Sequence, residues 1–444
     1  MQIDQTTLTD LSIIHQQDEF SIFNHLDFTQ TNDGRFYLKQ ILANPLKGIE
    51  EIVDVQHIIK HLIATKKHLP KTITNGTIMV LEKFYETALN NFPKSANVFN
   101  SSVYKIFYNS DFSLIKYSVQ HFINFIKGLN DLIEVLQSAN SKKVQVWVAK
   151  IKIILAKPNV VLLLNEQRNI DNLPSISIIN YGFFLRTFFK QDCFELIEIY
   201  SKIDAYNSLA IACKKFNFSF PKFTDSNEPF IMSKGLYHLV IDNPTTYEIV
   251  LEKGNNFLFL TGANMAGKST FIKAVGVAVF LAHIGMAVPA AEMELSYFDG
   301  ILSNIHVMDN IFKNESYFFN EVQRVKSTVE KINDNKKWLV LIDELFKGTN
   351  IQDAMKCSSV VIEGLQKREN AVFILSTHLY EIGENLKQYS NIQFKYFETK
   401  MSNNELTFNY QLKEGISNDR LGYLILEKEG VVELLKGDQK KMLQ

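Results

Sequence analysis

The chain has 444 residues, of which 46% are hydrophobic, and this is enough apolar material for the cores of roughly two to four domains. Its formal net charge of −1 excludes a strong overall basic field for attracting nucleic acid, although residues 51–200 carry a mild excess of Lys and Arg over Asp and Glu. The three cysteines (Cys193, Cys213 and Cys357) lie too far apart for a disulfide framework or a zinc site, which fits a reducing cytoplasm.

Helical periodicities dominate the first half of the chain. The clearest stripe has apolar residues three and four apart, which predicts one long helix packed against another. It consists of Phe112, Ile115, Val119, Phe122, Ile126, Leu129, Ile133 and Leu136. Residues 141–165 are also strongly apolar, but their pattern does not distinguish helix from strand. A further helix is predicted over residues 192–215.

Polar residues and a proline at 225–229 predict a boundary between two parts of the chain. We expect an all-α region over residues 1–225, an α/β region over 226–430 in which strands and helices alternate, and a short polar tail over 431–444. The apolar stretch from Ala274 to Ala291 resembles a membrane span in composition. Because His283 and Pro289 interrupt it, and because it begins inside a predicted helix, we expect it to lie in the protein core. No membrane partner is therefore predicted, and the N-terminus lacks the layout of a signal peptide.

The most informative segment is an apolar strand, Phe257 to Leu260, that runs into a phosphate-loop pattern and then a helix. In such a loop the glycines let backbone N–H groups face phosphate oxygens, and the helix directs its positive end to the same anion. Lys268 supplies charge to the β- and γ-phosphates, and the Ser269 hydroxyl can bind Mg²⁺. The pattern predicts a bound nucleotide held by Gly262, Ala263, Asn264, Met265, Ala266, Gly267, Lys268, Ser269 and Thr270.

Two further strand ends carry candidate catalytic groups. An apolar run from Trp338 to Ile342 ends in Asp343 and Glu344, where ligands of parallel sheets bind. Asp343 is predicted to hold Mg²⁺ directly or through another ligand, and Glu344 to orient and deprotonate a water that attacks the γ-phosphate. A second run, from Ala371, ends in Ser376-Thr377-His378. His378 taken alone is more often structural, but beside the other two motifs it is predicted to sense the γ-phosphate.

At these motifs the chain resembles the MutS family of DNA mismatch-repair ATPases. The loop is similar to T-G-P-N-M-x-G-K-S-T, with Ala263 in place of proline. Segment 284–290 is similar to I-G-x-x-V-P-A, and 343–350 to D-E-x-x-x-G-T-S, with Asn350 in place of serine. Residues 410–417 are similar to Y-x-L-x-x-G-x-S, and 314–321 to the signature G-x-S-T-F-M-x-E, with Asn314 in place of glycine. Segments near residues 26–46 and 203–210 also resemble the start of the family's helical core and the helix that joins its lever region to the ATPase.

The resemblance implies an α/β P-loop NTPase with an ABC-type ATPase sheet, preceded by a helical core and lever. It implies ATP and Mg²⁺ as ligands, and a homodimer through the ATPase domain in which Ser316 of one subunit caps the γ-phosphate of the other. An aromatic residue between Tyr237 and Tyr247 would stack on adenine, and Tyr247 is the preferred candidate. The family's mismatch-reading domain carries a Phe-x-Glu wedge, but Phe84-Tyr85-Glu86 matches only by its letters and lies in a predicted helix of the core region.

Two functions remain open from the sequence. The first is an ATP-dependent binder of double-stranded or branched DNA, in which hydrolysis at the dimer interface changes a clamp during mismatch repair or recombination. The second is a nucleotide-gated assembly protein that bridges partners and does not recognise mismatches directly. The resemblance along the chain motivates the first, which is the preferred function, and the near-neutral charge and the missing mismatch-reading domain motivate the second as the alternative.

Overall fold

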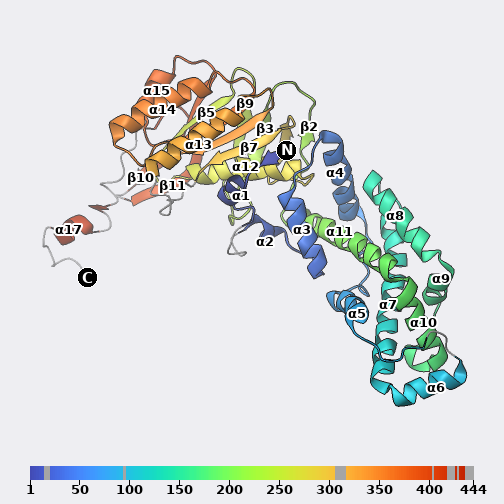
Figure 1. Cartoon of the computed structure of the whole chain (residues 1–444). Coiled ribbons are helices and arrows are strands. Elements are labelled where there is room, and N and C mark those ends of the chain that lie inside the picture. The colour runs from blue at the N-terminus through green and yellow to red at the C-terminus, as the bar shows by residue number, and fades with distance from the viewer. Residues whose placement is uncertain are drawn as a thin grey trace.

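The computed structural model describes residues 1–14, 21–93, 97–305, 317–402, 405–417, 426–427 and 430–435. Figure 1 shows an α/β body built around a sheet and an elongated arm of helices that extends away from it. The fold is thus mixed, with a central, mostly parallel sheet and many helices. The expected change from helices to alternating strands and helices is observed along the chain, and the boundary at residue 225 stays a prediction.

The central sheet has seven strands, and the phosphate-loop strand β5 lies between β9 and β10. Neighbouring strands are parallel except for the last pair, β10 and β11, which is antiparallel. The order across the sheet is β1 (Gln2–Ile3), β7 (Gly300–Asn304), β8 (Trp338–Asp343), β9 (Ala371–Ser376), β5 (Phe257–Thr261), β10 (Ile392–Ser402) and β11 (Glu405–Glu414). A second sheet has the order β2 (Lys222–Phe223), β6 (Glu292–Leu295), β3 (Ile231–Leu236) and β4 (Tyr247–Leu251).

Helices cover both faces of the central sheet, which explains why its inner strands are apolar throughout. Phe257 and Phe259 of β5 belong to the core under α13 (Tyr317–Lys331), α14 (Ile351–Leu365) and α15 (Glu381–Leu386). The alternate residues Leu258 and Leu260 belong to the core on the other face, with α1 (Gln5–Asp10) and α12 (Lys268–His283). The stretch that resembles a membrane span is part of this second core, as predicted, and no helix in the described residues is long and apolar enough to cross a membrane.

The arm contains the predicted long helix, α7, and the predicted helix near residues 192–215, α11. Residues 141–165 form two helices, α8 and α9, because Ser141 caps the first one and Pro158 begins the second one. The helices are α2 (Ile22–Leu26), α3 (Asn32–Ala43), α4 (Ile49–Ala64), α5 (Asn75–Glu86), α6 (Val98–Phe107), α7 (Asn109–Leu136), α8 (Lys142–Leu155), α9 (Pro158–Leu164), the 3₁₀ turn η2 (Ile170–Asn172), α10 (Ser175–Phe188) and α11 (Lys190–Lys215), and a short α17 (Val431–Leu435) follows the body.

The N-terminal residues differ from the expectation of an all-α region. Strand β1 pairs in parallel with Gly300 and Ile301 of β7, so it forms the edge of the central sheet. Helix α1 then packs on the face of that sheet, where Leu11 meets Gly276 of α12 so closely that a Cβ on the glycine would lie 2.6 Å from the leucine side chain. A two-residue strand is too short to show a periodicity. The helix that follows it, α1, covers an apolar face of the sheet, and this burial explains why the N-terminal segment lies on the body.

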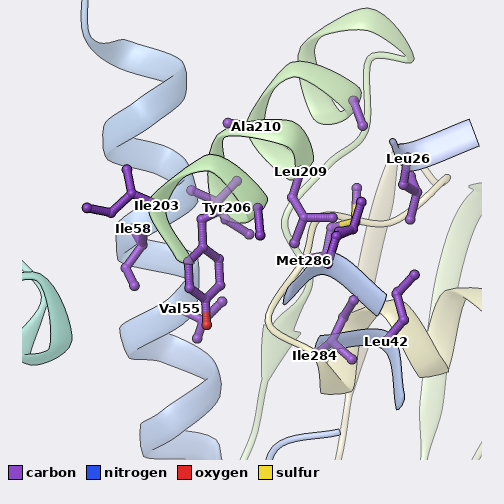
Figure 2. Packing of buried hydrophobic residues seen from close by; sticks show 14 of the residues in the cluster. Leu26, Leu42, Val55, Ile58, Ile203, Tyr206, Leu209, Ala210, Ile284 and Met286 are labelled. Carbon is purple, nitrogen blue, oxygen red and sulfur yellow. The ribbon is translucent and has the colours of Figure 1, made fainter. Parts of the chain in front are cut away.

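The arm joins the body where α3, α4 and α11 meet the segment after α12. Figure 2 shows Met286 of this segment beside Leu209 and Ile284 beside Leu42, and Val55 of α4 belongs to the same cluster. Gly285 between them has a φ of 80°, and a Cβ built on it would lie 2.6 Å from the Cβ of Val55. Only glycine therefore fits at this position of the I-G-x-x-V-P-A segment.

A buried carboxylate fixes the start of α3 to α11. Asp204, which is fully buried, accepts hydrogen bonds from the N–H of Gln30 at 3.0 Å, the N–H of Thr31 at 2.9 Å and the hydroxyl of Thr31 at 2.8 Å. Thr31 in turn caps α3 through the N–H of Gly34. The carboxylate therefore ties the arm's first long helix to the helix that leads back to the body.

We expect Asp204→Ala to lower the free energy of unfolding by about 2–4 kcal/mol, because it leaves three donors without their acceptor. Urea unfolding followed by circular dichroism measures this loss. Lys214→Ala changes an exposed residue of the same helix and should alter stability by less than about 0.5 kcal/mol. Equal effects of the two substitutions would contradict the role of Asp204.

Candidate functional site

Three strand ends meet at one edge of the central sheet. Ser376 at the end of β9 is in register with Leu260 of β5 on one side and with Asp343 of β8 on the other. The chain continues this alignment beyond the strands, since the N–H of Glu344 donates to the carbonyl of Ser376 at 3.0 Å and that of Thr377 to the carbonyl of Leu260 at 2.9 Å. The phosphate loop, the acid pair and the segment with His378 are thereby brought together, as the sequence predicts.

The phosphate loop is folded by residues with left-handed backbone angles. Gly262, Met265 and Gly267 have φ values of 137°, 67° and 106°, and α12 begins directly after them at Lys268. A Cβ on Gly262 would lie 3.3 Å from the backbone oxygen of Phe397, so the first glycine allows β10 to pass close to the loop. Such alternation of backbone angles turns successive N–H groups toward one point, which suits an anion.

Lys268 is buried and directed onto its own loop. Its ammonium group donates to the carbonyl of Gly262 at 2.8 Å and to that of Ala263 at 3.0 Å. Burial lowers the pKa of Lys268, while the negative charges of Glu344 and Asp343 oppose this shift. The ammonium thus lies inside the loop at a point where carboxylates face it, as a phosphate-binding lysine should.

A cavity of about 560 Å³ opens beside the loop, a size typical of sites for small ligands. Segment 238–245 with Tyr247 forms another part of its wall. The lining residues are His238, Ile241, Asp242, Asn243, Pro244, Thr245, Tyr247, Asn264, Met265, Gly267, Lys268, Ser269, Thr270, Glu344 and Tyr410. The predicted loop residues Gly262, Ala263 and Ala266 are not among them, whereas the other six predicted loop residues are.

Two tyrosines in the cavity wall differ in how free their rings are. Tyr247, the preferred adenine-stacking residue, is only 8% exposed, and its ring packs edge-on against Phe271 at 5.2 Å and Phe397 at 5.8 Å. Burial raises its pKa to about 12. Tyr410 is 44% exposed, has a left-handed φ of 55°, and lies so near the loop that a Cβ on Gly267 would be 3.3 Å from its ring. The ring of Tyr410 is therefore more accessible to a ligand in the cavity than the ring of Tyr247, although the sequence identified Tyr410 only as part of a motif.

A bulge in the hairpin of β10 and β11 places Tyr410. Phe397 pairs with Leu412 and Thr399 with Phe408, so that residues 409–411 oppose a single residue, Glu398. The amide of Asn409 donates to Glu398 at 2.8 Å and holds the bulge. Bulges commonly redirect a side chain near a functional site.

His238 is a second lining residue that sequence reasoning did not select as a ligand. Burial lowers its pKa to about 4, so that the imidazole is neutral near pH 7. Its position in the wall shows only in the structure, because the segment before β4 has no periodicity that places it.

Asp343 and Ser269 are the predicted metal-binding residues. Asp343 is 8% exposed and accepts a hydrogen bond from the hydroxyl of Ser376, and Ser269 is exposed at the cavity. Among the described residues no group of three or more His, Cys, Asp or Glu is arranged to hold a metal ion by itself. This donor set fits Mg²⁺, which is usually bound by one or two protein oxygens together with phosphate oxygens and water.

Glu344 lines the cavity and is held by two basic side chains. The Lys347 ammonium lies 3.1 Å from one carboxylate oxygen, and Nδ1 of His378 lies 3.6 Å from the other. His378 and Lys347 together lower the pKa of Glu344 to about 2 against the opposing effect of burial. Glu344 is therefore a carboxylate at neutral pH. His378 is 55% exposed and touches the cavity only through Glu344.

Two predicted features remain to be placed. Ser316 and Asn314 of the signature segment lie outside the described residues. Phe84 of the Phe-x-Glu sequence is buried in α5, where its ring meets that of Phe122 at 5.5 Å. A buried ring cannot stack on a base, in agreement with its assignment to the core.

The low pKa of Glu344 predicts a pH-dependent contribution to stability. A carboxyl group whose pKa falls from 4.5 to about 2 on folding stabilises the fold fully above pH 4.5, and the contribution is lost as the pH falls through about 2. We expect Glu344→Gln to lower the free energy of unfolding by about 1–3 kcal/mol at pH 7 and by progressively less towards about pH 3. Urea unfolding across this range measures the difference.

Glu384→Gln is the matched control, because Glu384 is an exposed carboxylate of α15. Its effect should be small at every pH. A deficit of Glu344→Gln that stays constant from neutral to acid pH would contradict the low pKa.

The region that carries these residues matches a known protein family. Residues 258–442 match the family described as MutS domain V. This span contains the phosphate loop, Asp343, Glu344 and His378.

Known relatives match over the same half of the chain. The DNA mismatch repair protein MutS of Pseudothermotoga lettingae is 30% identical over 244 residues, which are 54% of this chain and 29% of the relative. The DNA mismatch repair protein MSH3 of Candida glabrata is 32% identical over 243 residues (52% and 23%), and MutS of Thermotoga maritima is 30% identical over 246 residues (54% and 30%). The matched region thus spans less than a third of each of these relatives. Residues 258–442 thus carry a domain of the MutS domain V family, and this half of the chain is similar to MutS and MSH3 proteins.

Proposed function

We propose that the protein binds ATP with Mg²⁺ and hydrolyses it, as an α/β P-loop NTPase with an ABC-type ATPase sheet that drives a DNA-binding machine of the MutS type. The observation that carries this proposal is the cavity, since one wall is the loop with Lys268 and Ser269 and another includes Glu344. A lysine, a hydroxyl and an acid in this arrangement suit a ligand with a chain of phosphates.

In this proposal the loop binds the phosphates and α12 directs its positive end at them. Lys268 would exchange its bonds to the carbonyls of Gly262 and Ala263 for bonds to phosphate oxygens. Ser269 and Asp343 would hold Mg²⁺, which neutralises charge that develops on the phosphates. The ring of Tyr410, or that of Tyr247, would stack on the base.

Glu344 is assigned to the attacking water. Because its pKa is about 2, the carboxylate accepts a hydrogen bond at neutral pH and orients the water, but it is a weak proton acceptor while Lys347 and His378 hold it. His378 would sense the γ-phosphate through the shared contact with Glu344.

DNA and a second subunit complete the proposal. The relatives are named DNA mismatch repair proteins, and the helical arm that would act as a lever extends away from the body (Figure 1). We infer a homodimer through the ATPase region, with Ser316 of each subunit at the nucleotide of the other. ATP binding would then change the angle between two arms that hold double-stranded or branched DNA.

A second function is a nucleotide-gated assembly protein that bridges other proteins. It is favoured by exposed apolar side chains on α6 at the far end of the arm. Val98, Phe99, Ile106 and Phe107 are between 72% and 80% exposed there. Exposed apolar groups of this kind mark surfaces that contact another protein more often than nucleic acid.

Lys268→Ala tests the nucleotide site. Loss of the ammonium should weaken ATP binding at least about 100-fold, because a buried cation makes the strongest contact to the phosphates. Titration with a fluorescent ATP analogue measures the dissociation constant. Lys356→Ala, an exposed lysine of α14, should leave it unchanged. An ATP affinity of Lys268→Ala equal to that of the wild type would contradict the assignment of the nucleotide site.

Glu344→Gln tests hydrolysis and provides the trapped state for DNA binding. We expect turnover to fall about 100- to 1000-fold while the ATP dissociation constant changes less than about 3-fold. Steady-state phosphate release and equilibrium binding measure the two quantities. Turnover equal to that of the wild type would exclude Glu344 from the reaction.

The same variant decides between the two functions. Homoduplex, mismatched, looped and four-way-junction DNA are titrated at low and at near-physiological salt, with Lys268→Ala as the variant that cannot close on ATP. A DNA affinity that depends on ATP in Glu344→Gln supports the DNA-binding function. No affinity for any DNA at low salt would overturn it and would favour the assembly protein.

A further inference from the structure

Helix α13 carries a buried carboxylate that no step so far has used. The helix begins at Tyr317, inside the signature segment 314–321, and Glu321 is the last residue of that segment, just over one turn into the helix. Glu321 is 5% exposed. A charge buried to this degree needs strong hydrogen bonds to offset the cost of removing it from water.

The partners of Glu321 are two consecutive backbone N–H groups of the loop after β8. The N–H of Lys347 donates to one carboxylate oxygen at 3.0 Å, and the N–H of Gly348 donates to the other at 3.1 Å. Each oxygen therefore holds one residue of the loop. Hydrogen bonds to a charged acceptor are about twice as strong as neutral ones, so these two bonds attach the loop strongly to the carboxylate.

Close packing strengthens this connection. A Cβ on Gly348 would lie 2.8 Å from the backbone nitrogen of Phe318 and 2.7 Å from the ring of Tyr317, so only glycine lets the loop come this near to α13. The rings of Phe318 and Phe346 also meet at 5.7 Å. The first turn of α13 and the loop are thus interlocked through backbone, side chains and the carboxylate.

The loop held in this way carries the group assigned to the attacking water. Lys347, whose backbone Glu321 holds, extends its ammonium to within 3.1 Å of Glu344. An unbroken series of contacts therefore runs from α13 through Glu321 and Lys347 to the carboxylate of Glu344. Each link is a polar contact, and polar contacts depend on position to within a fraction of an ångström.

The next turn of α13 is fixed to the sheet. Arg324, three residues after Glu321, donates to the carbonyl of Ser303 at 3.0 Å and lies 3.4 Å from Asp10 of α1. Asp10 also accepts from the hydroxyl of Ser303 at 2.6 Å and from the N–H of Ile305 at 3.0 Å. Helix α13 therefore bridges the end of β7 and the loop after β8, and a displacement of the helix would change the contacts at both places.

We propose that Glu321 is a positioning residue for ATP hydrolysis, which fixes the loop of Lys347 and Glu344 to helix α13. A displacement of α13 is then transmitted to the carboxylate that orients the attacking water. This inference rests on the proposed ATPase function and deepens it, because it connects the helix that contains the end of the signature segment in one subunit to that subunit's own catalytic group.

The test compares Glu321→Gln, Glu321→Ala, Lys347→Met and the double variant Glu321→Gln with Lys347→Met. Gln keeps the shape but offers one acceptor oxygen in place of two, and Ala removes both. We expect kcat to fall about 10-fold or more for Ala and less for Gln, while the ATP dissociation constant changes less than about 3-fold, since the fault lies in orientation and not in binding.

The double variant distinguishes a positioning role from a general structural one. If Glu321 acts through Lys347, the double variant should be no slower than the slower of its two parents, whereas independent effects would multiply. Glu330→Gln changes an exposed carboxylate of the same helix and should leave both constants unchanged. Thermal melting of each variant shows whether it is folded at the assay temperature.

Several results would overturn the inference. These are an unchanged kcat in folded Glu321→Gln and Glu321→Ala, a loss of ATP affinity equal to the loss of kcat, or effects of Glu321 and Lys347 that multiply. A wild-type protein that binds no ATP or does not hydrolyse it refutes instead the proposed function, and the two failures are distinguished by the wild-type measurement alone.

Discussion

The register of three parallel strands is the constraint on which the site depends. Leu260 of β5 and Asp343 of β8 both pair with Ser376 of β9, so all three strands end at one level of the sheet. A shift of any strand by one residue would turn its side chains to the opposite face. The apolar faces of β5, β8 and β9 are buried on both sides by helices, and this burial fixes the register. The chemistry at the strand ends is thus positioned by the packing of residues that take no part in it.

The same packing connects the site to the arm. Helix α12 begins at the phosphate loop and ends at His283, which is fully buried. His283 accepts the N–H of Phe298 at Nε2, and Nδ1 then donates to the carbonyl of Val279, while its own carbonyl accepts the N–H of Leu46. Burial lowers the pKa of His283 to about 3, so this neutral arrangement persists at physiological pH. One helix therefore extends from the phosphate-loop pattern to the joint where Gly285 meets Val55, and a movement of that helix reaches the arm without an intermediate element.

The sequence predicts those parts of the structure that rest on local patterns. The phosphate loop, the strand that ends in Asp343 and the long helix α7 each have a spacing or a composition that identifies them within a few residues. Strand β1 has two residues and no pattern, and its place at the sheet edge follows only from its partner β7. Tyr410 reaches the loop through a bulge that depends on the pairing of two strands, and Glu321 binds backbone N–H groups, which every residue except proline has. Both residues belong to motifs of the sequence, but the motifs do not show these contacts, because a strand bulge and a backbone N–H partner leave no signal of their own in one sequence.

The loop after β8 has a strained backbone, and this strain is the reason why it needs a tight connection to α13. Glu344 and Phe346 have left-handed φ values of 63° and 58°, which each cost of order 1 kcal/mol for residues other than glycine. A segment with two such residues relaxes unless its surroundings hold it. Glu321 supplies two charge-assisted hydrogen bonds, and Phe318 packs on Phe346, so α13 provides contacts strong enough to offset this strain. The shape of the loop after β8 is therefore a property of the loop together with α13, and a change in the position of that helix alters the energy that keeps Glu344 directed at the cavity.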